Sequence, residues 1–327
     1  MKAKKLPDFA QRDEKAMNKG SRLTRLYAKM INRKKTLRWR EKPIHWLLFL
    51  SALVSVLTTL GIVFILFKES IVFFEEVSLK EYFFTTTWAP LFEPKHFGFL
   101  PLLSGTLMIA FGSAIVSLPF GVLTAIFLSE YASPSMRNWI KPSLEILSGI
   151  PSVVFGFFAL TFVTPVLQHF FPSTQIFNAA SACIVVGIMT LPMVASLCDD
   201  AMRAVPNSLR YAGYAMGATK SEVAFSIVFP AALSGVTASF VLAISRAIGE
   251  TMAVTLAAGA TPNLTLNPLE SIQTMTAYMV QVSSGDTPQG TIEYQTLFVI
   301  GATLFMITMI MNLISDMVLR KYKQKYE

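Results

Sequence analysis

The stretch AALSGVTASFVLAISRAIGETMAVTLAAGA, residues 231–260, carries only two charged side chains, those of Arg246 and Glu250. As one helix that rises about 1.5 Å per residue, thirty residues extend about 45 Å, which is more than the hydrocarbon core of a bilayer. Arg246 then lies near the middle of the membrane, where a charge costs about 2.5 to 3.5 kcal/mol. The stretch therefore predicts a membrane-spanning helix whose two charges need an explanation.

The same apolar character recurs along the chain. Hydrophobic residues make up 53% of the 327 residues, which is typical of a membrane protein with several spans. Each apolar run is long enough to cross a bilayer with some tilt. The six runs are 45–67, 100–128, 141–168, 176–198, 228–257 and 296–319. We expect an all-α integral membrane protein with six transmembrane helices.

The first run is uniformly apolar, whereas prolines and small residues interrupt the later ones. The prolines are Pro119, Pro151, Pro165 and Pro192. Such residues are tolerated in spans where neighbouring helices pack closely and satisfy the freed backbone groups. This difference predicts one accessory helix followed by a five-helix core.

The charges are distributed unevenly and set the expected orientation. Residues 1–42 hold fifteen Lys or Arg against four acids, and the C-terminal tail is basic again. The connection 68–99 has three Lys against five Glu, and 258–295 has no Lys or Arg. The positive-inside rule therefore places both termini in the cytoplasm and these two connections outside. The basic arm is not followed by any nucleic-acid-binding pattern, so we expect the protein to contact a lipid bilayer and not to bind nucleic acid.

The expected organisation follows the chain in order. A basic cytoplasmic arm (1–43) precedes the accessory helix (44–68), an external loop (69–99) and the core (100–320), and a cytoplasmic tail (321–327) ends the chain. Within the core we expect a cytoplasmic elbow at 199–230 and an external segment at 258–295. Apolar spacing at Leu269, Ile272, Met275 and Met279 predicts a short helix over the outer mouth of the bundle, with a surface hairpin as the alternative.

The elbow reads as two short helices joined by a glycine. The first is expected from about Ser208 to Met216, because Pro206-Asn207 is a helix-start signal. Gly217 supplies a left-handed stop. Thr219 and Glu222 have the spacing of a capping box and start the second helix. Such a rigid pair is suited to docking a partner, although an ordinary ordered loop would share these signals.

This elbow resembles the cytoplasmic signature of ABC importer permeases, E-A-A-x3-G-x9-I-x-L-P. Tyr211-Ala212-Gly213, Gly217, Ile227 and Phe229-Pro230 fall in that frame with the same spacing. Tyr211, Gly213 and Phe229 depart from the usual residues, so a docking glutamate is not available at position 211. The resemblance implies that the elbow sits in a groove of an ATP-binding subunit, with Arg210, Tyr211, Ala212, Gly213, Gly217, Thr219, Glu222 and Pro230 as its candidate residues.

Two further stretches, LEILSGIPSVVFGFFAL (144–160) and SRAIGETMAV (245–254), resemble the phosphate-uptake branch of the binding-protein-dependent transport permeases, specifically the PstC subunits. The resemblance covers about residues 44 to 320. It implies a bacterial inner-membrane protein that pairs with a homologous PstA-like permease, two PstB-like ATP-binding subunits and an extracytoplasmic PstS-like phosphate-binding protein. ATP and Mg²⁺ would be bound by the partner subunits and no cofactor by this chain.

The charge pair admits two interpretations. Arg246 and Glu250 are four residues apart, so on a continuous helix they share one face. They could be a mutually neutralising pair that only fixes packing, although apolar replacements of such pairs are often neutral or stabilising. Alternatively they face a transport pathway, where the arginine fork binds phosphate oxygens, Glu250 holds the guanidinium, and Gly249 permits close backbone approach. Intramembrane charges favour the functional interpretation.

Other classes of function fit the sequence less well. The chain has no phosphate loop of the form G-x4-G-K-[ST], no catalytic set, and no metal-ligand spacing among His45, His96 and His169. We therefore do not expect an enzyme. An ion-coupled secondary transporter would leave the elbow unexplained and would usually show matching halves. A PstA-like subunit, or a permease for sulfate or molybdate, remains an alternative, because an arginine suits all these anions.

Overall fold

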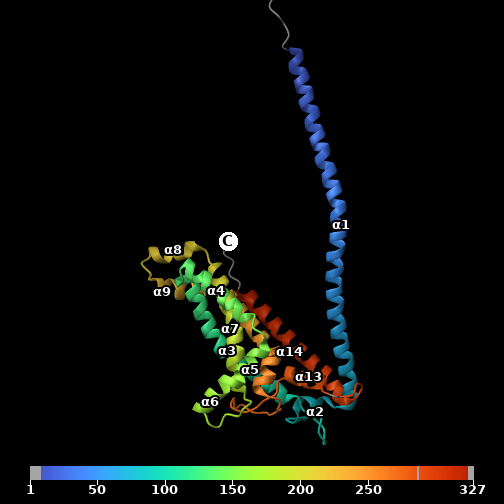
Figure 1. Cartoon of the computed structure of the whole chain (residues 1–327), viewed down its shortest axis with the longest axis vertical. Helices are drawn as coiled ribbons and strands as arrows, with labels where there is room; N and C mark the ends of the chain where they lie inside the picture. The colour runs from blue at the N-terminus through green and yellow to red at the C-terminus, as the bar shows by residue number, and fades with distance from the viewer. Residues whose placement is uncertain (1–8, 286, 323–327) are drawn as a thin grey trace, which may run out of the picture. The chain divides into compact units, whose positions relative to one another are not determined.

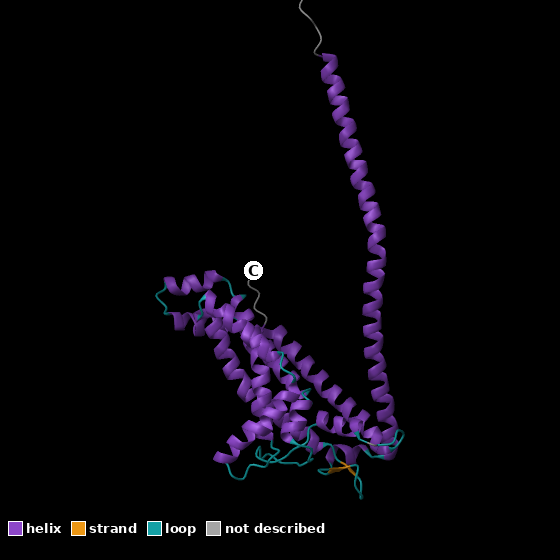
Figure 2. Cartoon of the chain, viewed as in Figure 1, coloured by secondary structure: helices purple, strands orange, loops and turns teal. Residues whose placement is uncertain are grey.

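The computed structural model describes residues 9–285 and 287–322, which fall into two units, Met1–Phe64 and Ile65–Glu327. Helix α1 (Phe9–Glu76) forms the described part of the first unit and continues into the second. Its segment from Pro43 to Glu76 is long and apolar enough to cross a membrane, and none of its most apolar window is buried. Apart from one small ribbon, the regular secondary structure of the described residues is helical, and loops connect the helices (Figure 2).

The core of the second unit is the pair α3 (Leu100–Ile126) and α7 (Ala179–Arg203), which pack along each other (Figure 1). Glycines allow this close approach. A Cβ atom on Gly121 would lie 2.6 Å from Cγ1 of Val194, and one on Gly187 would lie 2.6 Å from Cβ of Val116. Small residues at helix crossings are the usual means of tight packing in membranes, where apolar surface alone does not drive association.

Five helices of the described chain are candidate membrane spans, and a sixth arises if one bent helix pair is counted as a span. This agrees with the all-α membrane fold and the number of spans expected from the sequence. The five are Pro43–Glu76, Leu100–Tyr131, Ser152–Phe170, Ala179–Arg203 and Ile292–Met317. The last belongs to α14 (Ile292–Tyr322), and Leu100–Tyr131 includes the π-helical turn η1 (Phe127–Tyr131).

The apolar run 141–168 is not one helix, contrary to expectation. Helix α4 (Pro134–Ser148) ends at Gly149, and a new helical stretch begins at Ser152. Pro151 explains the break, because it has no N–H to donate and disfavours helical backbone at the residue before it. The second stretch contains three consecutive pieces: α5 (Ser152–Phe158), η2 (Ala159–Val163) and α6 (Thr164–Phe170).

The stretch 231–260 is also discontinuous, so the prediction of one thirty-residue helix was wrong. The segment 220–231, which consists of α9 (Lys220–Glu222), η3 (Val223–Val228) and α10 (Phe229–Ala231), is bent by 70° from α11 (Leu233–Ile248). Helix α11 stops at Gly249, and α12 (Met252–Ala258) follows. The Glu250 carboxylate accepts a hydrogen bond from the backbone N–H of Ala253 at 3.2 Å, which helps to start the new helix.

The two short helices that follow these breaks, α5 and α12, pack against each other. A Cβ atom on Gly156 would lie 2.8 Å from Cβ of Leu256 and 3.1 Å from Cα of Ala253. The two interruptions, at 149–151 and 249–251, therefore belong to neighbouring helices. Discontinuous helices inside membranes are tolerated where the freed backbone is covered by protein or lines a cavity.

The opposite end from the elbow carries the two long connections (Figure 1). One contains α2 (Leu79–Phe84) and the ribbon of β1 (Trp88–Ala89) and β2 (His96–Phe97), which pair antiparallel. The other contains α13 (Met275–Ser284). The predicted short helix is therefore present but begins at Met275, after Leu269 and Ile272. Ile272 and Met275 are both fully buried, which accounts for their apolar character.

Candidate functional site

The elbow has the local structure that its sequence predicts. Helix α8 (Asn207–Ala215) is followed by Gly217 with φ +86°, and then by α9. The capping box is complete: the Glu222 N–H donates to Thr219 Oγ1 at 3.4 Å, and the Thr219 N–H donates to Glu222 Oε2 at 2.7 Å. Its hydrogen bonds lie within the elbow itself, so the turn needs no partner protein to form.

Gly213 fixes how the two arms of the elbow meet. It is buried, and a Cβ atom there would lie 2.5 Å from Cδ1 of Ile227 and 3.1 Å from Cγ2 of Val223. The glycine therefore lets α8 lie against η3. Tyr211 on α8 and Met216 directly after it are exposed, at 68% and 88%. Ala212 is exposed as well, and Pro230 lies in the first turn of α10.

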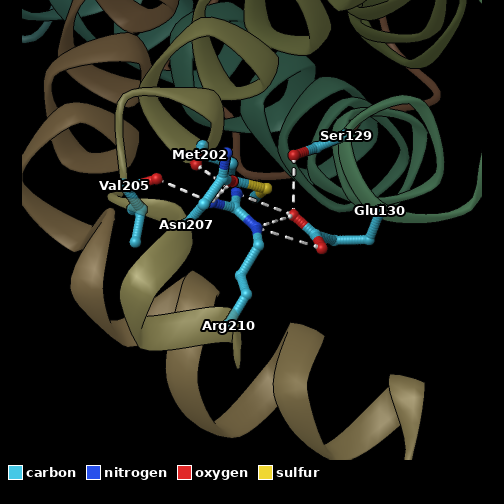
Figure 3. Close-up of polar contacts among 6 residues, drawn as sticks. All are labelled: Ser129, Glu130, Met202, Val205, Asn207 and Arg210. Carbon is cyan, nitrogen blue, oxygen red and sulfur yellow. Dashed lines mark hydrogen bonds and ion pairs between the residues drawn. The ribbon is translucent and has the colours of Figure 1, made fainter. Parts of the chain in front are cut away.

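Arg210 fastens the elbow to the rest of the chain (Figure 3). Its Nη2 donates to Glu130 Oε1 at 3.0 Å and to the Met202 carbonyl at 2.8 Å. Its Nη1 donates to the Val205 carbonyl at 2.6 Å and to Asn207 Oδ1 at 3.3 Å. The Arg210 and Glu130 side chains are only 13% and 5% exposed. Arg210 thus serves as an internal clamp that ties α8 to the end of α7 and to η1.

Sequence reasoning grouped Arg210 with the docking residues and missed Glu130. The available signal was the position of Glu130, which is the only acid in the stretch 100–132 and follows directly on its long apolar run. Glu130 and Arg210 line a cavity of about 550 Å³. A second arginine, Arg203, lines the same cavity. Arg203 is exposed, and its guanidinium has no hydrogen-bond or ion-pair partner within the described ranges.

A second cluster of charges holds α4 against α7. Arg137 Nη2 lies 2.5 Å from Asp199 Oδ2, and Lys141 Nζ lies 2.9 Å from Asp200 Oδ1 and 3.6 Å from Asp199 Oδ2. The Asp199 side chain is completely buried, whereas that of Asp200 is 60% exposed. The hydrogen bond to Asp200 raises the pKa of Lys141 above its ordinary value.

The structure does not form the expected pair between Arg246 and Glu250. Arg246 lies in the last turn of α11, and Glu250 lies beyond the helix end with its carboxylate turned to the N–H of Ala253. None of the described side chains forms an ion pair or a hydrogen bond with the exposed guanidinium of Arg246. A Cβ atom on Gly249 would meet only local backbone oxygens at 3.8 Å, so no other segment among the described residues uses the close approach that was expected there.

Arg246 instead lines a cavity of about 300 Å³ between α4, α7 and α11. The polar lining consists of Lys141, Glu145, Ser148, Ser196 and Arg246. The remaining lining is apolar and includes Leu144, Met189 and Pro192. The cavity combines two cations, one carboxylate and two hydroxyl groups beside a helix break, a combination that can bind a small anion.

The capping box offers a local test. Changing Thr219 to alanine removes the side-chain acceptor for the Glu222 N–H, whereas serine retains it. We expect the alanine variant to destabilise the start of α9 by about 1 kcal/mol. Hydrogen exchange of the amides in residues 219–223 should accelerate about fivefold in that variant and stay close to wild type with serine. Equal exchange in both variants would contradict the role of the cap.

Comparison with known proteins assigns the fold and the site to a family. Residues 117–325 match the family described as "Binding-protein-dependent transport system inner membrane component". The matched range covers more than half of the chain and contains the elbow, the cavity and both charge clusters. The chain belongs to this family. It is a multi-pass inner membrane permease subunit of an ABC importer that depends on a binding protein, and the ATPase is a separate subunit.

Individual relatives agree with this assignment. The permease is 33% identical over 238 residues to "Probable ABC transporter permease protein YqgH" of Bacillus subtilis, covering 73% of this chain and 77% of that one. It is 28% identical to "Phosphate transport system permease protein PstC" of Xylella fastidiosa (75% and 80% covered). The PstC protein of Pasteurella multocida is 29% identical (78% and 86% covered).

Solved structures share the fold at low sequence identity. A bacterial alginate ABC transporter has a TM-score of 0.57 at 16% identity, covering 86% of the permease and 97% of that chain. The MetNI methionine ABC transporter in an inward-facing conformation has a TM-score of 0.52 at 16% identity, covering 69% and 95%. These two likenesses support the architecture of the permease and carry no information about its cargo.

Proposed function

We propose that the permease forms half of the pathway for inorganic phosphate in an ATP-driven importer, as a PstC-type subunit. The observation that carries this proposal is the exposed Arg246, which lines a cavity at a helix break and lacks an ion-pair partner among the described residues. The names of the relatives from Xylella fastidiosa and Pasteurella multocida support phosphate as the cargo.

The chemistry of Arg246 suits this role. A guanidinium presents a planar fork of donors that matches the oxygens of a phosphate, and it stays charged at every physiological pH. Its position in the last turn of α11 also favours a cation, because the negative end of the helix dipole lies there. That dipole effect alone contributes about 0.3 to 1 kcal/mol. The helix dipole does not explain why the Arg246 guanidinium lines a cavity without forming an ion pair with any described carboxylate.

A PstC-type role implies a complete importer with further subunits. A PstA-like permease completes the pathway, two PstB-like subunits bind ATP and Mg²⁺, and a PstS-like protein delivers phosphate from outside. The exposed side of the elbow, with Tyr211 on α8 and Met216 after it, is the surface that would contact the ATP-binding subunit. Both termini of the permease would then lie in the cytoplasm, on the same side as the elbow.

The test is uptake of labelled phosphate in cells that lack this chain. Complementation with the wild type should restore uptake, whereas Arg246→Ala should lower it at least tenfold, because a hydrogen bond to a charged group contributes about 1.5 to 3 kcal/mol. Arg203→Ala is the matched control, since it removes an exposed arginine outside this cavity. Both variants must reach the membrane in equal amounts.

Each result has a definite meaning. Equal uptake by Arg246→Ala and wild type would remove Arg246 from the pathway. Failure of the wild type to restore phosphate uptake would reject phosphate, and sulfate or molybdate uptake in the same cells would identify another oxyanion as the cargo.

A further inference from the structure

Glu145 is the unexpected member of the cavity that Arg246 lines. It lies on α4, and its exposed carboxylate lines the same 300 Å³ space as the guanidinium. The two opposite charges do not pair with each other, and the described side chains supply no other partner to either of them. An arginine and a carboxylate that share a cavity without touching leave room for a small group between them.

The other polar groups add donors to this space. Ser196 has a hydroxyl without a hydrogen-bond partner among the described residues. Lys141 uses its ammonium for Asp200 and Asp199, which leaves it a further donor. The Ser148 hydroxyl donates to the Glu145 backbone carbonyl at 2.8 Å, so its oxygen remains an acceptor. The Glu145 carboxylate is the one charged acceptor among the residues that line the described cavity.

Two helix ends frame the cavity. Helix α4 ends at Ser148, and α11 ends at Ile248, two residues after Arg246. The ion pairs of Arg137 and Lys141 with Asp199 and Asp200 hold α4 against α7. Glu145 and Arg246 are therefore presented by two separately anchored helices, so their separation is set by the packing of α4 and α11 on α7.

The hydrogen-bond donors of this cavity, together with the single carboxylate of Glu145, distinguish between oxyanions. At neutral pH, inorganic phosphate retains at least one proton, whereas sulfate has none. A carboxylate accepts a hydrogen bond from a P–OH group, but it faces only bare negative oxygens on sulfate and repels them. Arginine and hydroxyl donors bind the unprotonated oxygens of either anion.

We propose that Glu145 and Arg246, with Ser196, form an anion site in the permease that selects a protonated oxyanion, phosphate, over a fully deprotonated one such as sulfate. This inference rests on the proposed phosphate pathway and adds a selectivity residue to it. Arg246 supplies the attraction for any oxyanion, and Glu145 supplies the discrimination. The permease then rejects sulfate independently of the external binding protein.

The test measures equilibrium binding to the complete transporter in lipid nanodiscs without the binding protein and without ATP. Labelled phosphate and labelled sulfate are the two probes. The wild type should prefer phosphate, and Glu145→Gln should reduce the ratio of the two affinities at least tenfold, through weaker phosphate and tighter sulfate binding. Glu145→Asp keeps a carboxylate and should retain most of the preference.

The controls separate selectivity from folding. Glu75→Gln changes an exposed carboxylate outside the cavity and should leave the ratio unchanged. Glu145 is itself exposed, so the glutamine variant should keep the thermal unfolding midpoint of the wild type. Loss of preference in Glu145→Gln but not in Glu75→Gln supports the proposal.

The selectivity role of Glu145 and the binding role of Arg246 are tested by different outcomes. If Glu145→Gln keeps the full preference for phosphate, or if the wild type binds both anions equally through Arg246, the selectivity role is wrong while the phosphate pathway stands. If Arg246→Ala binds both anions as well as the wild type does, Arg246 is not a binding residue, and the anion site falls together with the pathway role of Arg246, while the uptake measurement decides separately whether phosphate is the cargo.

Discussion

Replacing Arg210 with methionine is expected to destabilise the permease by about 3 to 5 kcal/mol, the usual effect of removing one partner of a buried ion pair. The Glu130 carboxylate, 5% exposed, would be left without its cation. The carbonyls of Met202 and Val205 would also lose the donors that fix the start of the elbow. Thermal unfolding of the purified transporter and transport in cells should both show the loss.

Two further variants show whether the clamp acts as a pair. Arg203→Met removes an exposed arginine from the 550 Å³ cavity that Glu130 and Arg210 also line. This variant should change the free energy of unfolding by less than about 0.5 kcal/mol. The double variant Glu130→Met, Arg210→Met should be more stable than Arg210→Met alone, because no buried charge is then left without a partner. A double variant that is no more stable than the single one would show that the carbonyl contacts, rather than the ion pair, hold the elbow.

Changing Asp199 to alanine is expected to have a comparable effect at the other cluster, again about 3 to 5 kcal/mol. Its completely buried carboxylate faces both Arg137 and Lys141, so Arg137 loses its anchor on α7 and Lys141 keeps only its ion pair with Asp200. Because α4 forms one wall of the Arg246 cavity, we expect faster hydrogen exchange along residues 134–148 together with a lower unfolding midpoint.

The adjacent residue provides the matched control for this variant. Asp200 is 60% exposed and pairs with Lys141 alone, so Asp200→Ala should cost no more than about 1 kcal/mol. If the two alanine variants are equally stable, burial of Asp199 does not make its ion pair important, and α4 must be held by apolar packing.

The sequence predicts the local features of the permease well because their causes lie within a few residues. Apolar runs longer than a bilayer is thick have few alternatives to spanning helices, so the membrane fold follows from composition and length. The capping box at Thr219 and the left-handed Gly217 are likewise set by neighbouring backbone groups. The resemblance of the elbow to ABC importer permeases rests on the same local spacing.

Tertiary structure alone decided which charges meet. A helical reading of 231–260 placed Arg246 and Glu250 on one face, but the chain breaks at Gly249 and turns the glutamate to cap α12. Glu145, which shares the cavity of Arg246, lies about a hundred residues away on α4, and Glu130 reaches Arg210 from eighty positions earlier in the chain. Spacing along one helix fixes contacts over three or four residues, whereas pairing between helices depends on how they pack and where they are interrupted. The sequence by itself therefore determined the membrane fold and the elbow, while the structure determined where two of the spans are interrupted, the clamp and the composition of the candidate anion site.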